Sequence, residues 1–141
     1  MIRYAKETDR KALYHLICEL EETKLDQEAF FRIFADQLSD ERYLCLVYER
    51  DHAVIGVCNV RMENQLHHCA RIAEIMELSV SSSLRSQGIG KQLLDHAYTL
   101  VKQQGCMQME VSSNQKRIHA HHFYEREGFD KHHFKFTRAL V

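Results

Sequence analysis

The sequence contains no proline, no segment dominated by Gly and Ser or by charge of one sign, and no internal repeat. These absences leave nothing that marks a linker or a second domain. No apolar run approaches the roughly 20 residues that span a bilayer, and the first residues lack the apolar core of a signal peptide. We therefore expect a single cytoplasmic domain over residues 1–141, without a membrane as partner.

An excess of one charge is also missing, because 19 Lys and Arg residues stand against 20 Asp and Glu residues, for a formal net charge of −1. A chain with this balance has no overall basic field to hold nucleic acid or anionic lipid. The five cysteines form no CxxC pair, which argues against a disulfide framework or a zinc site of thiolates. Partners must therefore be recognised by local features, and nucleic acid is not expected among them.

Apolar residues recur with two different periods along the chain. Helical spacing runs through residues 8–20, 26–39, 88–105 and 118–127. Segments typical of strands lie at residues 2–5, 43–49, 53–62, 72–80, 107–113 and 133–140. The predicted order is β-α-α-β-β-β-α-β-α-β. This is an α/β (α+β) fold, in which a meander followed by helical crossovers gives a mixed central β-sheet with helices on both faces.

The sharpest chemical feature is the segment 77–94, where a strand ends, a polar loop follows, and Gly88 and Gly90 open the clearest helix. The N-terminus of a helix presents unpaired N–H groups and a partial positive charge, and glycine lets the backbone approach a diphosphate closely. The spacing matches neither GxxxxGK[ST] nor GxGxxG, so ATP and dinucleotides are poorly supported. The segment is therefore predicted to cradle an anion of another kind.

The run RSQGIG at residues 85–90 resembles the R/Q-x-x-G-x-G/A signature of the GNAT superfamily of N-acetyltransferases. Residues 2–20 are similar to its first strand and helix, and residues 120–129 to its A-x-x-F-Y-x-x-x-G-F motif. The resemblance implies a GNAT fold and an enzyme that transfers acetyl from acetyl-CoA to a primary amine. The residues it implies for cofactor binding are Leu78, Ser79 and Val80 along the strand, then Arg85, Ser86, Gln87, Gly88, Ile89, Gly90 and Lys91 around the pyrophosphate.

The same resemblance assigns the chemistry. Tyr124 matches the tyrosine that protonates the departing thiolate. Glu74 lies where several members carry the catalytic glutamate, and Glu77 is the runner-up; simple alternation along the strand puts the two on opposite faces. Asn114 is the candidate for the asparagine that holds the pantetheine arm, although many members place it seven positions before the tyrosine, where this chain has Arg117. Nothing requires a covalent intermediate, so we expect direct attack of the amine on bound acetyl-CoA.

Three segments, residues 16–30, 66–80 and 122–140, resemble the aminoalkylphosphonate N-acetyltransferases, which acetylate small amines that carry a phosphonate. This resemblance implies a small-molecule substrate with an amine and an anionic group. The candidate ligands of the phosphonate are then His67, His68 and Arg71. These enzymes are also associated with divalent metal. Ten histidines include no HEXXH motif and no Cys/His quartet, so no metal ligand is assigned, and a divalent metal that helps to hold the substrate stays open.

Two alternatives stay open. Within the same reaction, the acceptor is instead a polyamine, an amino acid or the N-terminus of a protein. In the second alternative, which is not an enzyme, the chain is an acyl-CoA-binding sensor that has lost its catalytic activity. The presence of Tyr124 and Glu74 counts against this alternative. An edge strand near the C-terminus would also allow a homodimer.

Overall fold

A computed structural model describes the whole chain, residues 1–141. Its strands are β1 (Ile2–Tyr4), β2 (Tyr43–Arg50), β3 (Ala53–Gln65), β4 (Ala70–Val80) and β5 (Gln108–Val111). Its helices are α1 (Arg10–Glu21), α2 (Gln27–Leu38), α3 (Ile89–Gln103) and α4 (Ile118–Arg126). No helix combines the length and the apolar character needed to cross a membrane.

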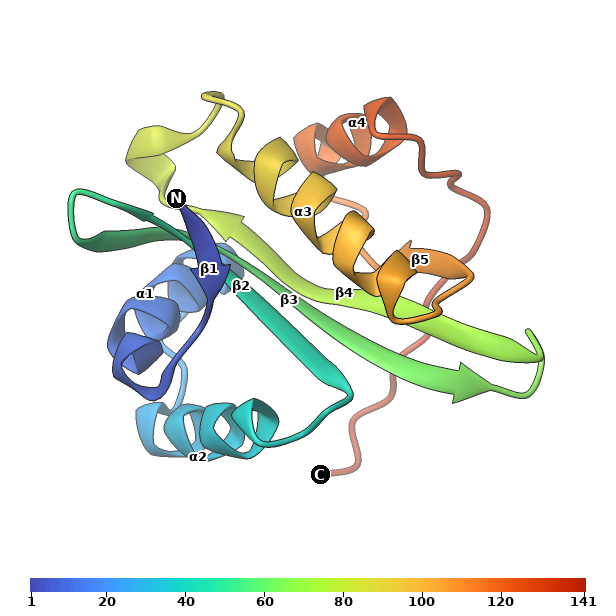
Figure 1. Cartoon of the computed structure of the whole chain (residues 1–141), viewed down its shortest axis with the longest axis horizontal. Coiled ribbons are helices and arrows are strands. Elements are labelled where there is room, and N and C mark those ends of the chain that lie inside the picture. Colours follow the sequence, from blue (N-terminus) through green and yellow to red (C-terminus); the bar gives the residue numbers. More distant parts are fainter.

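The strands form one sheet in the order β1-β2-β3-β4-β5. Neighbours are antiparallel from β1 to β4, whereas β5 runs parallel to β4. Figure 1 shows α1 and α2 on one face of the sheet and α3 and α4 on the other. The predicted mixed sheet with helices on both faces is therefore confirmed.

Two apolar clusters hold the helices to the sheet. One packs α3 against the sheet, through buried residues that include Ile89, Leu93, Ala97, Cys58 and Val60. The other packs α1 and α2 against the opposite face, through Leu13, Leu16, Ile17, Phe34, Val47 and Val57. Val57 and Cys58 are adjacent in β3 and enter different clusters, as the alternation of side chains along a strand requires. The sheet is thus buried on both faces along its middle strands.

One irregularity interrupts β4. Glu77 pairs with Asn59, whereas Ile75 pairs with Val60, so Met76 is an extra residue in the register. Two residues of one strand then stand opposite one of its partner, which is a β-bulge. A bulge reverses the alternation of side chains beyond it, and this decides which face the following residues occupy.

β4 also leaves β5 at this bulge. Its pairing with β5 covers only Ile72 to Ile75, although its pairing with β3 continues to Val80. The backbone of residues 76–80 therefore has no partner strand on the side of β5. The strand edge at Leu78 to Val80, where the family resemblance implies binding of the cofactor, is therefore splayed from β5, and its role in binding stays a prediction.

The predicted last strand at residues 133–140 is wrong. No regular element follows α4, and the side chains of Phe134 and Phe136 are exposed. Alternation of apolar side chains gives a segment the pattern of a strand, but a strand forms only where a neighbour pairs with its N–H and C=O groups. β5 remains the edge of the sheet, and the order along the chain ends with α4.

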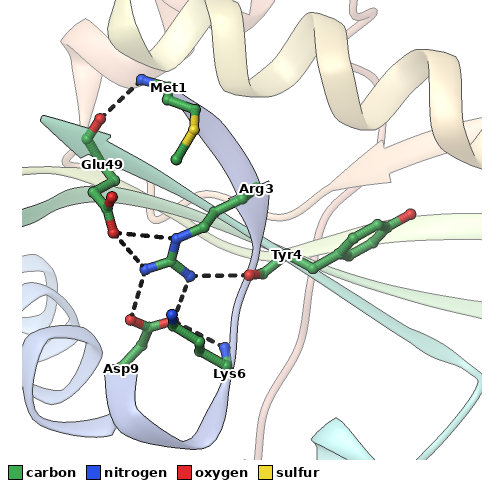
Figure 2. Close-up of polar contacts among 6 residues, drawn as sticks. All are labelled: Met1, Arg3, Tyr4, Lys6, Asp9 and Glu49. Carbon is green, nitrogen blue, oxygen red and sulfur yellow. Dashed lines mark hydrogen bonds and ion pairs between the residues drawn. The ribbon is translucent and has the colours of Figure 1, made fainter.

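Arg3 in β1 ties the edge of the sheet to the start of α1, as Figure 2 shows. Its guanidinium donates to both carboxylate oxygens of Asp9, at 2.8 and 3.0 Å, and to Glu49 at 2.8 and 3.2 Å. The side chain of Asp9 is only 7% exposed. Burial alone raises the pKa of Asp9, but hydrogen bonds from Arg3 and from the backbone of Lys6 outweigh it and hold this pKa below its usual range. Asp9 is therefore a buried carboxylate that depends on Arg3.

Replacing Arg3 by Ala should lower the free energy of unfolding by about 1–3 kcal/mol at neutral pH, because the buried Asp9 carboxylate loses its charged partner. A carboxyl with a depressed pKa stabilises the fold above its unfolded pKa, and this contribution is lost as pH falls through its folded pKa. The difference between the two proteins should therefore shrink in acid. Urea unfolding at neutral and acidic pH measures it. Arg42→Ala, which removes an exposed pair with Asp40, is the control and should change stability little.

Candidate functional site

The parting of β4 and β5 opens a cleft of about 220 Å³. Its walls come from the end of α1, the second half of β4, the end of β5, and α4 with the loop before it. The lining residues are Leu20, Glu21, Ile75, Met76, Glu77, Leu78, Val111, Ser112, Ser113, Asn114, Arg117, Ala120 and Tyr124. The cleft thus brings together four residues that the sequence singled out: Glu77, Leu78, Asn114 and Tyr124.

The bulge places the two candidate glutamates on the same face of the sheet. Glu77 Oε1 accepts a hydrogen bond from Asn59 Nδ2 at 2.8 Å, and Glu74 Oε1 accepts one from Arg61 Nη2 at 3.0 Å. Asn59 and Arg61 are two residues apart in β3 and therefore share a face. The expectation that Glu74 and Glu77 lie on opposite faces is wrong, because Met76 is an extra residue between them.

Glu77 has the environment of a general base. Burial raises its pKa, the hydrogen bond from Asn59 lowers it, and the charge of Glu21 raises it again, so that the net shift is upward. Asn59 is only 7% exposed and also donates from Nδ2 to Gln37 Oε1, in α2, at 3.0 Å. The amide of Asn59 is therefore fixed from α2, and it in turn fixes the carboxyl group of Glu77.

Glu74 occupies a different environment. It does not line the cleft, and its partner Arg61 also contacts Glu63 at 3.2 Å. These three side chains form an ion-pair network on the surface of the sheet. The structure thus favours Glu77 over Glu74, the reverse of the order that the sequence suggested.

Tyr124 lines the cleft from α4. Its ring packs edge-on against Phe123 and Phe129, with ring centroids 5.3 and 5.5 Å away. Burial, with a smaller effect of Cys58, raises the pKa of Tyr124 to about 12, although the charge of Arg117 acts to lower it. The phenol therefore keeps its proton at neutral pH and is able to donate it.

The turn before α3 carries the free backbone donors that anion binding needs. Among the backbone hydrogen bonds outside the helices and strands, none has its donor N–H group in residues 85–91. The first turn of a helix has no internal acceptors for these groups either. Gly88 has a φ of 81°, in the left-handed region that glycine adopts without strain, and Ser86 has a φ of 65° in the same region. Ile89 is only 1% exposed and belongs to the apolar core beneath the turn. The arrangement fits a diphosphate.

The two cations of this turn are already engaged with the protein. Arg85 Nε donates to the backbone oxygen of Val80 at 3.2 Å, and its guanidinium lies 3.7 Å from Glu19. Lys91 Nζ donates to Glu127 at 2.9 Å. The backbone N–H groups, rather than these side chains, are therefore the free donors of the turn.

Arg117, which precedes α4, spans the cleft to the end of α1. Its Nη2 donates to the backbone oxygen of Leu20 at 2.8 Å and lies 3.8 Å from Glu21 Oε1. Asn114 lines the cleft one turn earlier, and its Oδ1 accepts from the backbone N–H of Lys116 at 2.9 Å. The loop between β5 and α4 thus supplies the cleft with one amide and one cation.

The three residues predicted to bind a phosphonate lie far from this cleft. His67 and His68 belong to the turn that joins β3 and β4, the tip of the long hairpin in Figure 1, and Arg71 is at the start of β4. Leu78 follows Arg71 by seven residues of strand, which is roughly 20 Å at the usual rise per residue. The structure does not bring these residues together with Glu77 and Tyr124, and their role stays a prediction.

The side chains also bear on the divalent metal that the sequence left open. No group of three or more His, Cys, Asp or Glu side chains is arranged to hold a metal ion. The adjacent rings of His67 and His68 are tilted with centroids 4.2 Å apart, and those of His132 and His133 with centroids 4.7 Å apart, and neither pair has a third ligand. A metal site therefore gains no support from the arrangement of these residues.

Sequence reasoning missed Asn59 and gave Arg117 no role. The signal for Asn59 was present as a single amide within the apolar run 53–62. A buried polar group in such a run needs a partner, and that requirement points to a network. For Arg117, the signal was a cation at the position where many members of the superfamily carry an asparagine.

The chain matches the Acetyltransferase (GNAT) family over residues 10–129. The aminoalkylphosphonate N-acetyltransferase of Salmonella typhimurium (strain LT2) is 42% identical over 139 residues, which cover 99% of this chain and 90% of that protein. Among solved structures, a transcriptional regulator from Bacillus halodurans C-125 has a TM-score of 0.91 at 24% identity, over 99% of both chains. Aminoglycoside N-acetyltransferase AAC(6')-Iy, in complex with CoA, has a TM-score of 0.89 at 17% identity, over all of this chain and 95% of the other.

Proposed function

The chain belongs to the Acetyltransferase (GNAT) family, and on that premise we propose that it acetylates the primary amine of a small aminoalkylphosphonate. Acetyl-CoA-dependent N-acetyltransferase activity follows from membership of the family. The choice of substrate rests on one observation, the identity of 42% with the Salmonella aminoalkylphosphonate enzyme over 99% of this chain. A substrate of this class joins an amine, which accepts the acetyl group, to an anion that the protein must recognise.

Two features of the backbone support a place for acetyl-CoA. Its pyrophosphate accepts hydrogen bonds from the free N–H groups of residues 85–91, at the start of α3. Its pantetheine arm, which contains amides, adds to the edge of β4 beyond Met76, where β4 has no partner strand on the side of β5. Leu78 and Tyr124 line the cleft beside this edge, so we assign the acetyl thioester to the space near them.

The acceptor enters as an ammonium ion and must lose a proton before its nitrogen can attack. We assign this proton to the carboxylate of Glu77. The nitrogen then attacks the thioester carbon, and the N–H group of Leu78 stabilises the oxyanion. As the C–S bond breaks, Tyr124 protonates the sulfur. The nitrogen sheds its second proton, which restores the phenol, and the proton on Glu77 leaves to solvent. The products are the acetamide and CoA with a free thiol.

The substrate is tested by incubating the protein with acetyl-CoA and a panel of amines, with thiol release followed optically and the acetylated product identified by mass spectrometry. We expect the highest kcat/KM for an aminoalkylphosphonate, above a polyamine, an amino acid, a peptide N-terminus and an alkylamine of the same chain length. A higher value for the polyamine or the peptide would refute the substrate but not the transferase. Binding of acetyl-CoA without thiol release from any amine would instead indicate a sensor.

Replacing Glu77 by Gln should lower kcat by about 10²- to 10⁴-fold, the usual contribution of a general base. Glu74→Gln is the matched control on the same face and should keep most of the activity. Burial raises the pKa of Glu77, and the carboxylate is the active form. As pH is lowered, kcat of the wild type should therefore begin to fall at a higher pH than it would with a glutamate of ordinary pKa. A larger loss in Glu74→Gln than in Glu77→Gln contradicts the assignment of the base.

Replacing Tyr124 by Phe keeps the ring that packs against Phe123 and Phe129 and removes only the acidic proton. We expect kcat to fall by about 10²-fold or more, while the Kd of acetyl-CoA, measured by calorimetry, stays close to that of the wild type. Tyr98→Phe, on the exposed side of α3, is the control for loss of a hydroxyl group. Unchanged turnover in Tyr124→Phe would remove this residue as the acid.

A further inference from the structure

We propose that Arg117 binds the anionic group of the substrate and thereby sets the preference for an amine that carries a phosphonate; this inference rests on the proposed function. The cleft that holds Glu77 and Tyr124 has thirteen lining residues, and Arg117 is the only Lys or Arg among them. Two of the others, Glu21 and Glu77, are acidic. An anion that entered the cleft without help from Arg117 would meet only negative charge and neutral groups.

The guanidinium of Arg117 is held by one of its nitrogens and free at the others. Nη2 is engaged by the backbone oxygen of Leu20 and lies near Glu21, whereas Nε and Nη1 donate no hydrogen bond to the protein. The side chain is 37% exposed, and neither nitrogen is among the buried atoms that lack a partner, so both are accessible to a ligand. A guanidinium presents a planar fork of N–H donors that matches two oxygens of a phosphonate. One fixed nitrogen reduces the entropy that the side chain loses when it binds.

The position of Arg117 also suits a short substrate. Arg117 directly precedes α4 and Tyr124 is the seventh residue of that helix, so about two turns of helix separate them, and both line the cleft. Its charge reaches the phenol of Tyr124, since it acts to lower the pKa of that group. The hydroxyl groups of Ser112 and Ser113 line the same wall and make no hydrogen bond to each other or to Arg117. An anion held here leaves the amine, a few carbon atoms away, directed toward the rest of the cleft, which contains Glu77.

The test compares two amines of equal chain length, one with a terminal phosphonate and one without, in the wild type and in Arg117→Gln. Glutamine keeps a polar N–H donor, on a shorter side chain, but has no charge. We expect kcat/KM for the aminoalkylphosphonate to fall about 10- to 100-fold, through KM. For the alkylamine, and for the KM of acetyl-CoA, we expect changes within about twofold. Arg117→Lys, which keeps the charge but not the fork, should recover part of the loss.

Lys116→Gln is the matched control, since it removes one positive charge from the neighbouring exposed position outside the cleft. It should leave both amines unaffected. An equal loss for the two amines in Arg117→Gln would make Arg117 a structural link between α4 and α1. A raised KM for acetyl-CoA would make it a cofactor ligand. Either result overturns this inference and leaves the proposed substrate standing. If the wild type acetylates the alkylamine but not the aminoalkylphosphonate, the proposed substrate and this inference fail together.

Discussion

The cleft depends on a single extra residue in β4. Met76 breaks the register with β3, and at the same point β4 leaves β5, so that one bulge creates both an unpaired strand edge and a space beside it. The bulge also reverses the alternation of side chains, which turns Glu77 to the face where Asn59 lies. Without the extra residue, the alternation of side chains would carry Glu77 on the opposite face, away from Asn59.

Holding Glu77 in this environment costs stability. A carboxyl whose folded pKa is raised is most compatible with the fold below its unfolded pKa, and stability is lost as pH rises through the folded pKa. Asp9 behaves in the opposite way, because Arg3 depresses its pKa and its contribution is lost only in acid. The two carboxyls thus differ in their partners. The half-buried Glu77 has no cation beside it and is able to accept a proton, whereas the buried Asp9 is held ionised by Arg3 and fastens β1 to α1.

The elements that pattern and propensity govern could be predicted from the sequence. The apolar stripes of α1, α2 and α3 follow helical spacing. Asp26, a residue type common at helix N-caps, caps α2, since its carboxylate accepts the N–H of Ala29 at 3.2 Å. The turn with Gly88 was also found, because its chemistry is local. The face of the sheet on which Glu74 and Glu77 lie could not be predicted, because a bulge depends on pairing between strands and does not alter the apolar periodicity of the sequence. The position of His67 in the sequence, just before β4, did not reveal its distance from the cleft, because that distance depends on the length of the β3–β4 hairpin.

The two anions of the proposed reaction are recognised by different means, and each means suits its task. Backbone N–H groups at the start of α3 receive the pyrophosphate, which is the same in every turnover. Only a substitution to proline removes such a donor, so binding of acetyl-CoA does not depend on the side chains that select the acceptor. The acceptor's anion instead meets a side chain, Arg117, on a wall built by α4 and the loop before it. Because a side chain changes by single substitution, a fold of this kind can exchange one amine for another while its cofactor site stays intact. In the proposed reaction, the choice of acceptor therefore depends on Arg117 in this wall, whereas binding of acetyl-CoA depends on the backbone of β4 and of the turn before α3.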